Sequence, residues 1–364
     1  MELFFDLVYV FAFTQLSELL YEHPSWIGGA ETAVIFVALW WAWIYTTWAT
    51  GMIDPTRPRV VLLLSVMMVA SLVMATSILK SFDGRGPTFA IAYVAMQVLC
   101  GGFMVWVFGP RDPMGHNYLH LLVWIAISGV IWIAGAFVPD PHTRLLLWAI
   151  AAGVDVVAPL LDFRLPLTGA TPVSQWALAG GHLAERCQLL LMIAFGESFL
   201  RIGESFAAHH GTLASDTGFI VGFVLVFSLW TVYFMRHAER AARTVAEAGE
   251  NAARLARSAY TYAHAVMVGA VIVLAVAIHE VIEAPKAQVD VAFAAICAGG
   301  PALYLIGFAL SRRWLGHGYA IWAMAGVAGF AVVGIATGSW VRLVELLGVT
   351  AVAVLVSLSA ERAG

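Results

Sequence analysis

The chain has 364 residues, of which 61% are hydrophobic and only 12% are charged. Soluble domains average about 45–50% apolar and about 25% charged residues, because a folded globule needs a solvated surface. This composition excludes an ordinary soluble domain, and a net charge of −4 argues against a nucleic-acid partner. We expect an all-α integral membrane protein whose first partner is the lipid bilayer.

Twelve apolar runs follow one another, and each approaches the roughly 20 residues that a membrane-spanning helix needs. Breakers such as Asp54-Pro55 and Gly109-Pro110 separate them. We therefore expect a polytopic bundle of about twelve transmembrane helices, with eleven as the alternative because only Gly338-Ser339 separates the last two runs. The runs are Leu3–Leu20, Ala33–Thr50, Val60–Leu79, Thr88–Phe108, Tyr118–Val138, Leu145–Leu161, Leu183–Phe206, Phe219–Met235, Ala259–Val281, Val291–Leu310, Tyr319–Thr337 and Trp340–Leu358.

The basic residues indicate how the chain crosses the membrane. With twelve spans, thirteen of the nineteen Lys and Arg residues lie in the loops on the side of the N-terminus. Because cytoplasmic loops carry the excess of Lys and Arg, both ends of the chain are expected in the cytoplasm. Trp26, Trp48, Trp314 and Trp340 lie near run ends, where tryptophans anchor helices at the membrane interface.

The two halves of the chain share a short pattern. Ala12-Phe13-Thr14-Gln15 in the first run matches Ala194-Phe195-Gly196-Glu197 in the seventh, at an offset of 182 residues. This match predicts two six-helix halves, residues 1–182 and 183–364, related as parallel repeats. Within the second half, residues 236–258 form the longest polar connector.

The connector is rich in Ala, Glu and Arg. Glu239 and Arg243 stand four residues apart, as do Glu250 and Arg254, a spacing that forms ion pairs on a helix surface. We expect a helical cytoplasmic connector that is solvated next to the lipid headgroups, with a partner-binding or regulatory surface as the alternative.

The seventh run carries charges where lipid surrounds the chain. Glu197, Arg201 and Glu204 recur at i, i+4 and i+7, so one helix face shows an acid, a base and an acid. A charge at the bilayer centre costs roughly 2.5–3.5 kcal/mol, so such residues need partners and indicate function. The pattern predicts a proton or cation site in which Glu197 titrates or coordinates and Arg201 neutralises it. An ion pair that only fixes helix packing is the alternative.

Other polar residues of the apolar runs are weaker candidates for the same site. Asp6 and Asp155 are expected as secondary polar sites, and Gln15 and Glu185 as further ion or substrate contacts. His264 is either a hydrogen-bonded packing residue or a proton relay.

Aromatic residues crowd the second run. Trp40, Trp41, Trp43, Tyr45 and Trp48 fall within nine residues and point around the whole helix. They indicate either packing and interface anchoring or an aromatic wall along a substrate path.

Signatures of enzymes and cofactors are missing from the sequence. His279 and Glu283 could share a metal, but no HExxH and no Cys/His metal spacing accompanies them. Phosphate-binding glycine loops, GxSxG and the dinucleotide fingerprint are also missing. We expect no metal, no cofactor and no enzymatic activity, with an intramembrane enzyme as the last alternative.

Several motifs resemble those of the bacterial low-temperature-requirement A (LtrA) family, in the right order along most of the chain. The family's seventh-helix motif commonly has leucine where Phe195 precedes Gly196 here, and this change keeps an apolar residue. The resembling segments are Glu2–Val10, Trp40–Trp48 with Asp54-Pro55, His182–Arg186 with Ile193–Ser198, Leu229–Phe234, and Tyr260–His264.

The resemblance implies a multi-pass protein of the bacterial inner membrane, linked by its name to growth in the cold, without a settled substrate. The motif positions that it marks are Glu2, Asp6, His182, Glu185, Arg186, Gly196, Glu197, Trp230, Tyr233, Tyr262 and His264. Phe4-Phe5-Asp6 is also similar in spacing to the first-helix motif of a small potassium-channel family, with Phe5 in place of its serine.

The sequence thus favours a secondary transporter or ion-coupled transport-like protein for an unknown small molecule or ion. The alternatives are a cation channel and a non-transporting membrane sensor or scaffold linked to cold growth.

Overall fold

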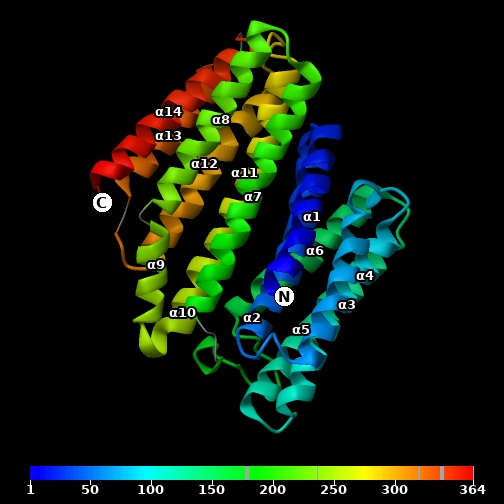
Figure 1. The fold of residues 1–364 in the computed structure, drawn as a ribbon. Coiled ribbons are helices and arrows are strands. Elements are labelled where there is room, and N and C mark those ends of the chain that lie inside the picture. Colours follow the sequence, from blue (N-terminus) through cyan, green and yellow to red (C-terminus); the bar gives the residue numbers. More distant parts are fainter. Residues whose placement is uncertain (177–179, 236, 319, 337–339, 364) are drawn as a thin grey trace. The chain divides into compact units, whose positions relative to one another are not determined.

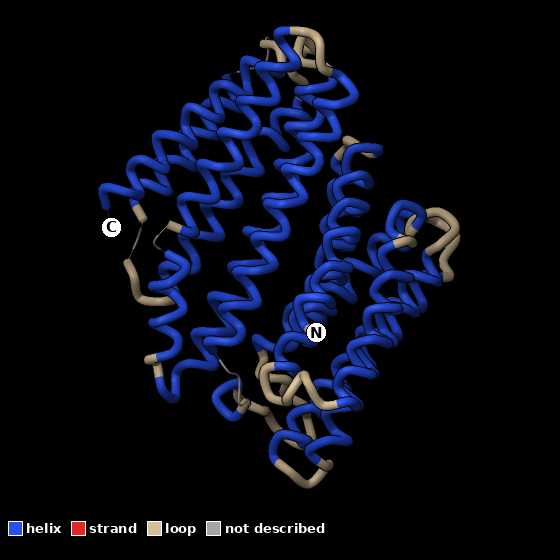
Figure 2. Tube along the Cα trace, viewed as in Figure 1, coloured by secondary structure: helices blue, strands red, loops and turns tan. Residues whose placement is uncertain are grey.

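The computed structural model describes residues 1–176, 180–235, 237–318, 320–336 and 340–363. Most of the residues in these ranges are helical, and no strand forms among them beyond two isolated bridges. Figure 2 shows the tube as helices joined by short loops. The prediction of an all-α fold is confirmed.

Twelve long helices account for the twelve predicted runs in the described part of the chain (Figure 1). Two short helices, α9 (His237–Ala246) and α10 (Ala252–Ala256), lie in the connector. The long helices are α1 (Glu2–Glu22), α2 (Trp26–Thr50), α3 (Pro58–Ala75), α4 (Gly86–Phe108), α5 (Pro113–Ala136), α6 (Pro141–Leu160), α7 (Gly180–His209), α8 (Leu213–Phe234), α11 (His264–Glu283), α12 (Val291–Trp314), α13 (Ile321–Ala336) and α14 (Arg342–Ala363).

Ten helical segments of the described chain are long and apolar enough to cross a membrane. Two long helices fall outside this set for different reasons. Helix α13 has only 16 residues, and α7 has 30 residues but carries charges along its length. The protein is therefore a multi-pass membrane protein in which α7 is the most polar long helix.

Aspartate and proline start several of these helices. The Asp112 side chain accepts from the Met114 amide at 2.8 Å, and Asp140 accepts from the Thr143 amide at 2.7 Å. Pro113 and Pro141 follow directly at the first helical position. A backbone N–H at this position has no acceptor within the helix, so proline, which has none, fits there. Asp-Pro pairs thus start α5 and α6, whereas the breakers Asp54-Pro55 and Gly109-Pro110 lie in the loops before α3 and α5.

Helix α3 ends four residues earlier than the run Val60–Leu79 predicted. The hydroxyls of Thr76 and Ser77 both donate to the Val73 carbonyl at 2.9 Å, and Ile78–Lys80 form a 3₁₀ turn. Such side-chain bonds compete with the helical pattern at a helix end.

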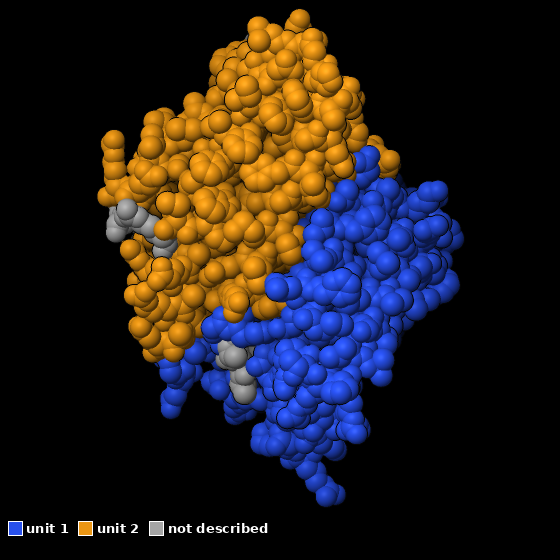
Figure 3. Space-filling view, viewed as in Figure 1, with its two compact units in different colours: residues 1–19, 27–183, 249–254 blue, residues 20–26, 184–248, 255–364 orange. Residues whose placement is uncertain are grey.

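The chain divides into two compact units, coloured in Figure 3. Unit 1 comprises Met1–Leu19, Ile27–Leu183 and Gly249–Arg254. Unit 2 comprises Leu20–Trp26, Ala184–Ala248 and Leu255–Gly364. The parallel repeat of two six-helix halves stays a prediction.

In unit 1, helices α3 to α6 pack in chain order, each on the next. The aromatic residues of α2 are buried, with Trp40, Trp41 and Trp43 at most 2% exposed. Trp48 is also 2% exposed and packs on the Trp176 ring at 5.7 Å, so its prediction as an interface anchor is wrong. Trp26, the first residue of α2 and part of unit 2, is 74% exposed, as an interface anchor would be.

In unit 2, helices α7 and α11 run parallel and side by side. The Cys187 thiol donates to the Tyr260 carbonyl, and the Ser198 hydroxyl to the Val271 carbonyl. Both pairs are separated by 73 residues, so the two helices advance in the same direction and in register. Residues of α7 therefore lie next to residues about 73 positions later in the chain.

Helices α11 and α12 approach closely because α12 has glycines at the contact. A Cβ placed on Gly307 would lie 2.9 Å from the Ala263 carbonyl oxygen and 2.8 Å from the Met267 side chain. Small residues of this kind let transmembrane helices meet backbone to backbone.

We expect Gly307→Ala to lower the free energy of unfolding by about 1–3 kcal/mol, because its methyl group overpacks this contact. Gly299→Ala on the same helix is the matched control, since nothing lies within 4 Å of a Cβ there. Denaturation of both variants in detergent micelles measures the difference. Equal stability of the two variants would show that the helices can move apart without a loss in the free energy of unfolding.

The connector contains α9 and α10, as the Ala, Glu and Arg pattern predicts. The ion pair between Glu239 and Arg243 is present at 2.7 Å. The predicted partner of Arg254 is wrong: its guanidinium donates to the Asn251 side chain at 3.1 Å and not to Glu250. The residues Gly249–Asn251 form a 3₁₀ turn, which breaks the regular i, i+4 spacing.

Candidate functional site

The charged face of α7 lies inside unit 2. Glu197 is 2% exposed, and its Oε1 lies 3.4 Å from Nε of Arg201, whose side chain is 11% exposed. Glu204, the third member of the predicted face, is exposed. The structure thus buries one acid and its base together, and leaves the second acid at the surface.

A track of polar side chains continues from this pair along α7 and α11. Ser205 lies one turn beyond Arg201 and donates to its carbonyl at 2.8 Å. The same hydroxyl contacts Nδ1 of His279, the residue of α11 that faces this turn. His279 Nε2 in turn lies 3.9 Å from Glu283, one turn further along. We call Ser205, His279 and Glu283 the polar track.

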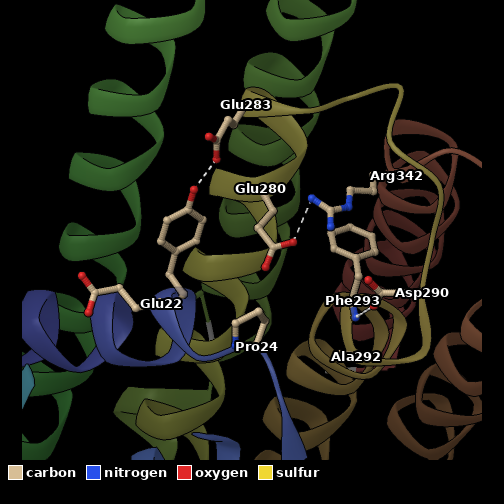
Figure 4. A pocket seen from close by; sticks show the side chains of 9 residues that line it. Glu22, Pro24, Glu280, Glu283, Asp290, Ala292, Phe293 and Arg342 are labelled. Carbon is tan, nitrogen blue, oxygen red and sulfur yellow. Dashed lines mark hydrogen bonds and ion pairs between the residues drawn. The ribbon is translucent and has the colours of Figure 1, made fainter. Parts of the chain in front are cut away.

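The polar track ends in a pocket at the C-terminal end of α11, which we call the acidic pocket (Figure 4). Its volume is about 340 Å³, and four carboxylates and one guanidinium line it. Tyr21 of α1 donates to Glu283, and Arg342 of α14 pairs with Glu280 at 2.9 Å. The lining residues are Tyr21, Glu22, Pro24, Glu280, Glu283, Asp290, Ala292, Phe293 and Arg342.

Two further contacts position the acidic pocket. The Asp290 carboxylate caps α12 by accepting from the Phe293 amide at 2.7 Å, and the guanidinium of Arg342 lies 4.8 Å above the Phe293 ring. Sequence reasoning found only the His279 and Glu283 pair, because the remaining residues come from helices far apart in the chain. Among the described residues no three metal-binding side chains converge as a metal site requires.

His264 lies near the other end of α11, where both ring nitrogens are engaged. Nδ1 contacts the Ala259 carbonyl at 2.8 Å, so it carries the proton, and Nε2 therefore accepts from the Tyr233 hydroxyl at 2.6 Å. Residues Arg257–Ala263 form a π-helical turn, a feature frequent at functional sites. Tyr262 within this turn is half-buried.

Unit 1 also holds a buried carboxylate among the predicted site residues, Asp155. Asp155 of α6 is 4% exposed and accepts from the Tyr93 hydroxyl at 2.7 Å and from the Trp132 indole at 3.0 Å. Gln97 donates to the Tyr93 hydroxyl at 3.1 Å. Neutral donors from α4 and α5 surround this carboxylate.

The remaining motif positions occupy varied surroundings. Asp6 is fully buried and accepts from the Trp43 indole at 2.8 Å. Glu2 contacts Nε2 of His182 at 3.1 Å. Of the other candidates, Gln15 is half-buried, Glu185 is exposed, and Arg186 is buried. Gly196 has open space where a Cβ would stand, and Trp230 donates to the Met192 sulfur at 3.3 Å.

These features define a class of protein: a multi-pass α-helical membrane protein with charged side chains buried inside its helix bundle. The chain belongs to the family described as bacterial low temperature requirement A protein (LtrA), whose sequence profile matches residues 1–359. The resemblance found in the sequence motifs is thereby confirmed.

A similar protein comes from Rhizobium meliloti (strain 1021) and bears the name "Uncharacterized protein RA0937". It is 37% identical to this chain over 314 residues, which are 86% of this chain and 76% of the relative. No solved structure matches the chain.

Proposed function

We propose that this chain is an ion-coupled secondary transporter of the bacterial inner membrane, with both ends in the cytoplasm. Glu197 takes up the coupled proton or cation, and Arg201 neutralises the carboxylate when that site is empty. The transported substrate is a small molecule or ion, and we propose no catalytic reaction.

The observation that carries this proposal is the buried Glu197–Arg201 pair, one helical turn from the polar track that ends at the acidic pocket. Ionisable residues inside membrane helices are rare and mark ion pathways or proton relays. Four carboxylates at one end of the track would concentrate cations there. The coupled proton or cation then competes with Arg201 for the Glu197 carboxylate. The site therefore has two states, one with the ion bound and one with the Arg201 ion pair.

Flux into proteoliposomes tests the proposal. The purified chain is reconstituted with a pH-sensitive dye, and potassium, sodium and proton gradients are imposed in turn. We expect one gradient to be dissipated with saturating kinetics, and Glu197→Gln to reduce this flux to that of empty liposomes, because the amide does not titrate.

Glu239→Gln is the matched control, because Glu239 has the same i, i+4 spacing to an arginine but is 82% exposed. We expect it to transport as the unmodified chain does. A folded Glu197→Gln variant that transports at full rate would refute the role of Glu197. Flux that rises with concentration without saturating would instead identify a cation channel.

A further inference from the structure

A group of basic side chains lies at the end of unit 2 opposite to the acidic pocket. His237 and Arg240 come from α9, Arg312 from the last turn of α12, and His317 from the loop that follows it. The His237 and His317 rings lie 5.9 Å apart, and Arg312 donates to the His317 carbonyl at 2.9 Å. We call these four residues the basic cluster.

The fold holds the basic cluster in place through hydroxyl groups and a tight loop. Thr244 of α9 contacts Nε2 of His317 at 2.8 Å, and Ser311 of α12 contacts Nε2 of His237 at 3.3 Å. Gly316 and Gly318 have φ angles of 76° and 75°, in the left-handed region that favours glycine. These two glycines let the loop fold His317 back onto α9.

Three polar atoms of the basic cluster are buried and form no hydrogen bond with the described residues. They are Nδ1 of His237, Nδ1 of His317 and Nε of Arg312. His237 as a whole is 3% exposed. Buried polar groups are nearly always hydrogen-bonded, and Nε of Arg312 is always a donor, so the cluster offers a buried donor to an acceptor from outside the chain.

The electrostatics of the basic cluster also favour an anion there. Burial, and then the charges of Arg312 and Arg240, lower the pKa of His317 below its usual value. Positive charges therefore face one another, and an anion between them would relieve this repulsion.

We propose that the basic cluster binds a phosphate group, whose oxygens match guanidinium and imidazole donors. A cavity of about 240 Å³, lined by Met235, Glu239, Arg240 and Arg243, borders the cluster at Arg240. Trp314, two residues after Arg312, is 37% exposed, as expected of a residue that anchors a helix at the membrane boundary. At that boundary the phosphate group comes either from the headgroup of an anionic lipid or from inorganic phosphate in solution.

Two measurements on the purified full chain test the site and separate these sources. The melting temperature in neutral detergent is followed with inorganic phosphate, and native mass spectrometry counts bound phosphatidylglycerol against phosphatidylcholine. We expect Arg312→Gln to weaken binding of the phosphate group at least about tenfold, the loss of one charge-assisted hydrogen bond. Arg254→Gln on α10 is the control, because Arg254 is exposed and lies outside the cluster.

His317→Leu provides a second variant, placed in a loop, in case Arg312→Gln does not fold. Stabilisation by phosphate in the unmodified chain, lost in either folded variant, supports a site open to the free anion. Retention of phosphatidylglycerol without any effect of phosphate supports the lipid headgroup as the source. The proposal is overturned if neither probe binds, or if both variants bind as tightly as the unmodified chain.

Discussion

Arg201→Ala is expected to lower the free energy of unfolding by about 3–5 kcal/mol, because it leaves the buried Glu197 carboxylate without its cation. Glu197 is 2% exposed, so water cannot replace the guanidinium. The corresponding change at the connector, Arg243→Ala, is expected to lower the free energy of unfolding by only about 0.3–0.5 kcal/mol. That ion pair has the same spacing, but its side chains are 65% and 82% exposed.

A double variant separates the structural role of the pair from its functional role. Glu197→Leu with Arg201→Met removes both charges and keeps apolar volume, so most of the stability lost in Arg201→Ala should return. Denaturation in mixed micelles measures stability, and the proteoliposome assay measures flux on the same preparations. A stable double variant with full flux would reduce the pair to a packing element. A stable variant without flux would assign it to transport.

Asp155→Ala is expected to lower the free energy of unfolding by about 2–6 kcal/mol. The Tyr93 hydroxyl and the Trp132 indole both donate to this carboxylate, and each buried donor left without an acceptor costs about 1–3 kcal/mol. Asp155→Asn keeps an acceptor oxygen, so its free energy of unfolding should fall much less. The free energy of unfolding of both variants is measured under the same micellar conditions.

Asp54 supplies the control for this prediction. Its carboxylate also accepts two hydrogen bonds, from the Thr56 amide at 2.9 Å and the Thr56 hydroxyl at 2.6 Å, but the residue is exposed. Water replaces the lost acceptor there, so Asp54→Ala should leave the stability nearly unchanged. A loss at Asp155 no larger than at Asp54 would show that water reaches the interior of unit 1.

Patterns that span only a few residues were sufficient for much of the fold. The low charge and the length of the apolar runs determined the membrane class, since a helix that long satisfies its own backbone in lipid. Aspartate followed by proline determined where α5 and α6 begin. The pairing of Glu197 with Arg201 could also be predicted, because an i, i+4 spacing places both side chains on one face before any packing occurs.

Contacts between distant parts of the chain were decided only by the tertiary structure. Asp155 receives its donors from α4 and α5, and the acidic pocket is assembled from α1, α11, α12 and α14. Trp48 lies near a run end, yet it is buried against Trp176, which no local pattern indicates. Helical periodicity shows which face of a helix is polar, but the partner of that face depends on packing between helices, whose order in space the periodicity leaves open.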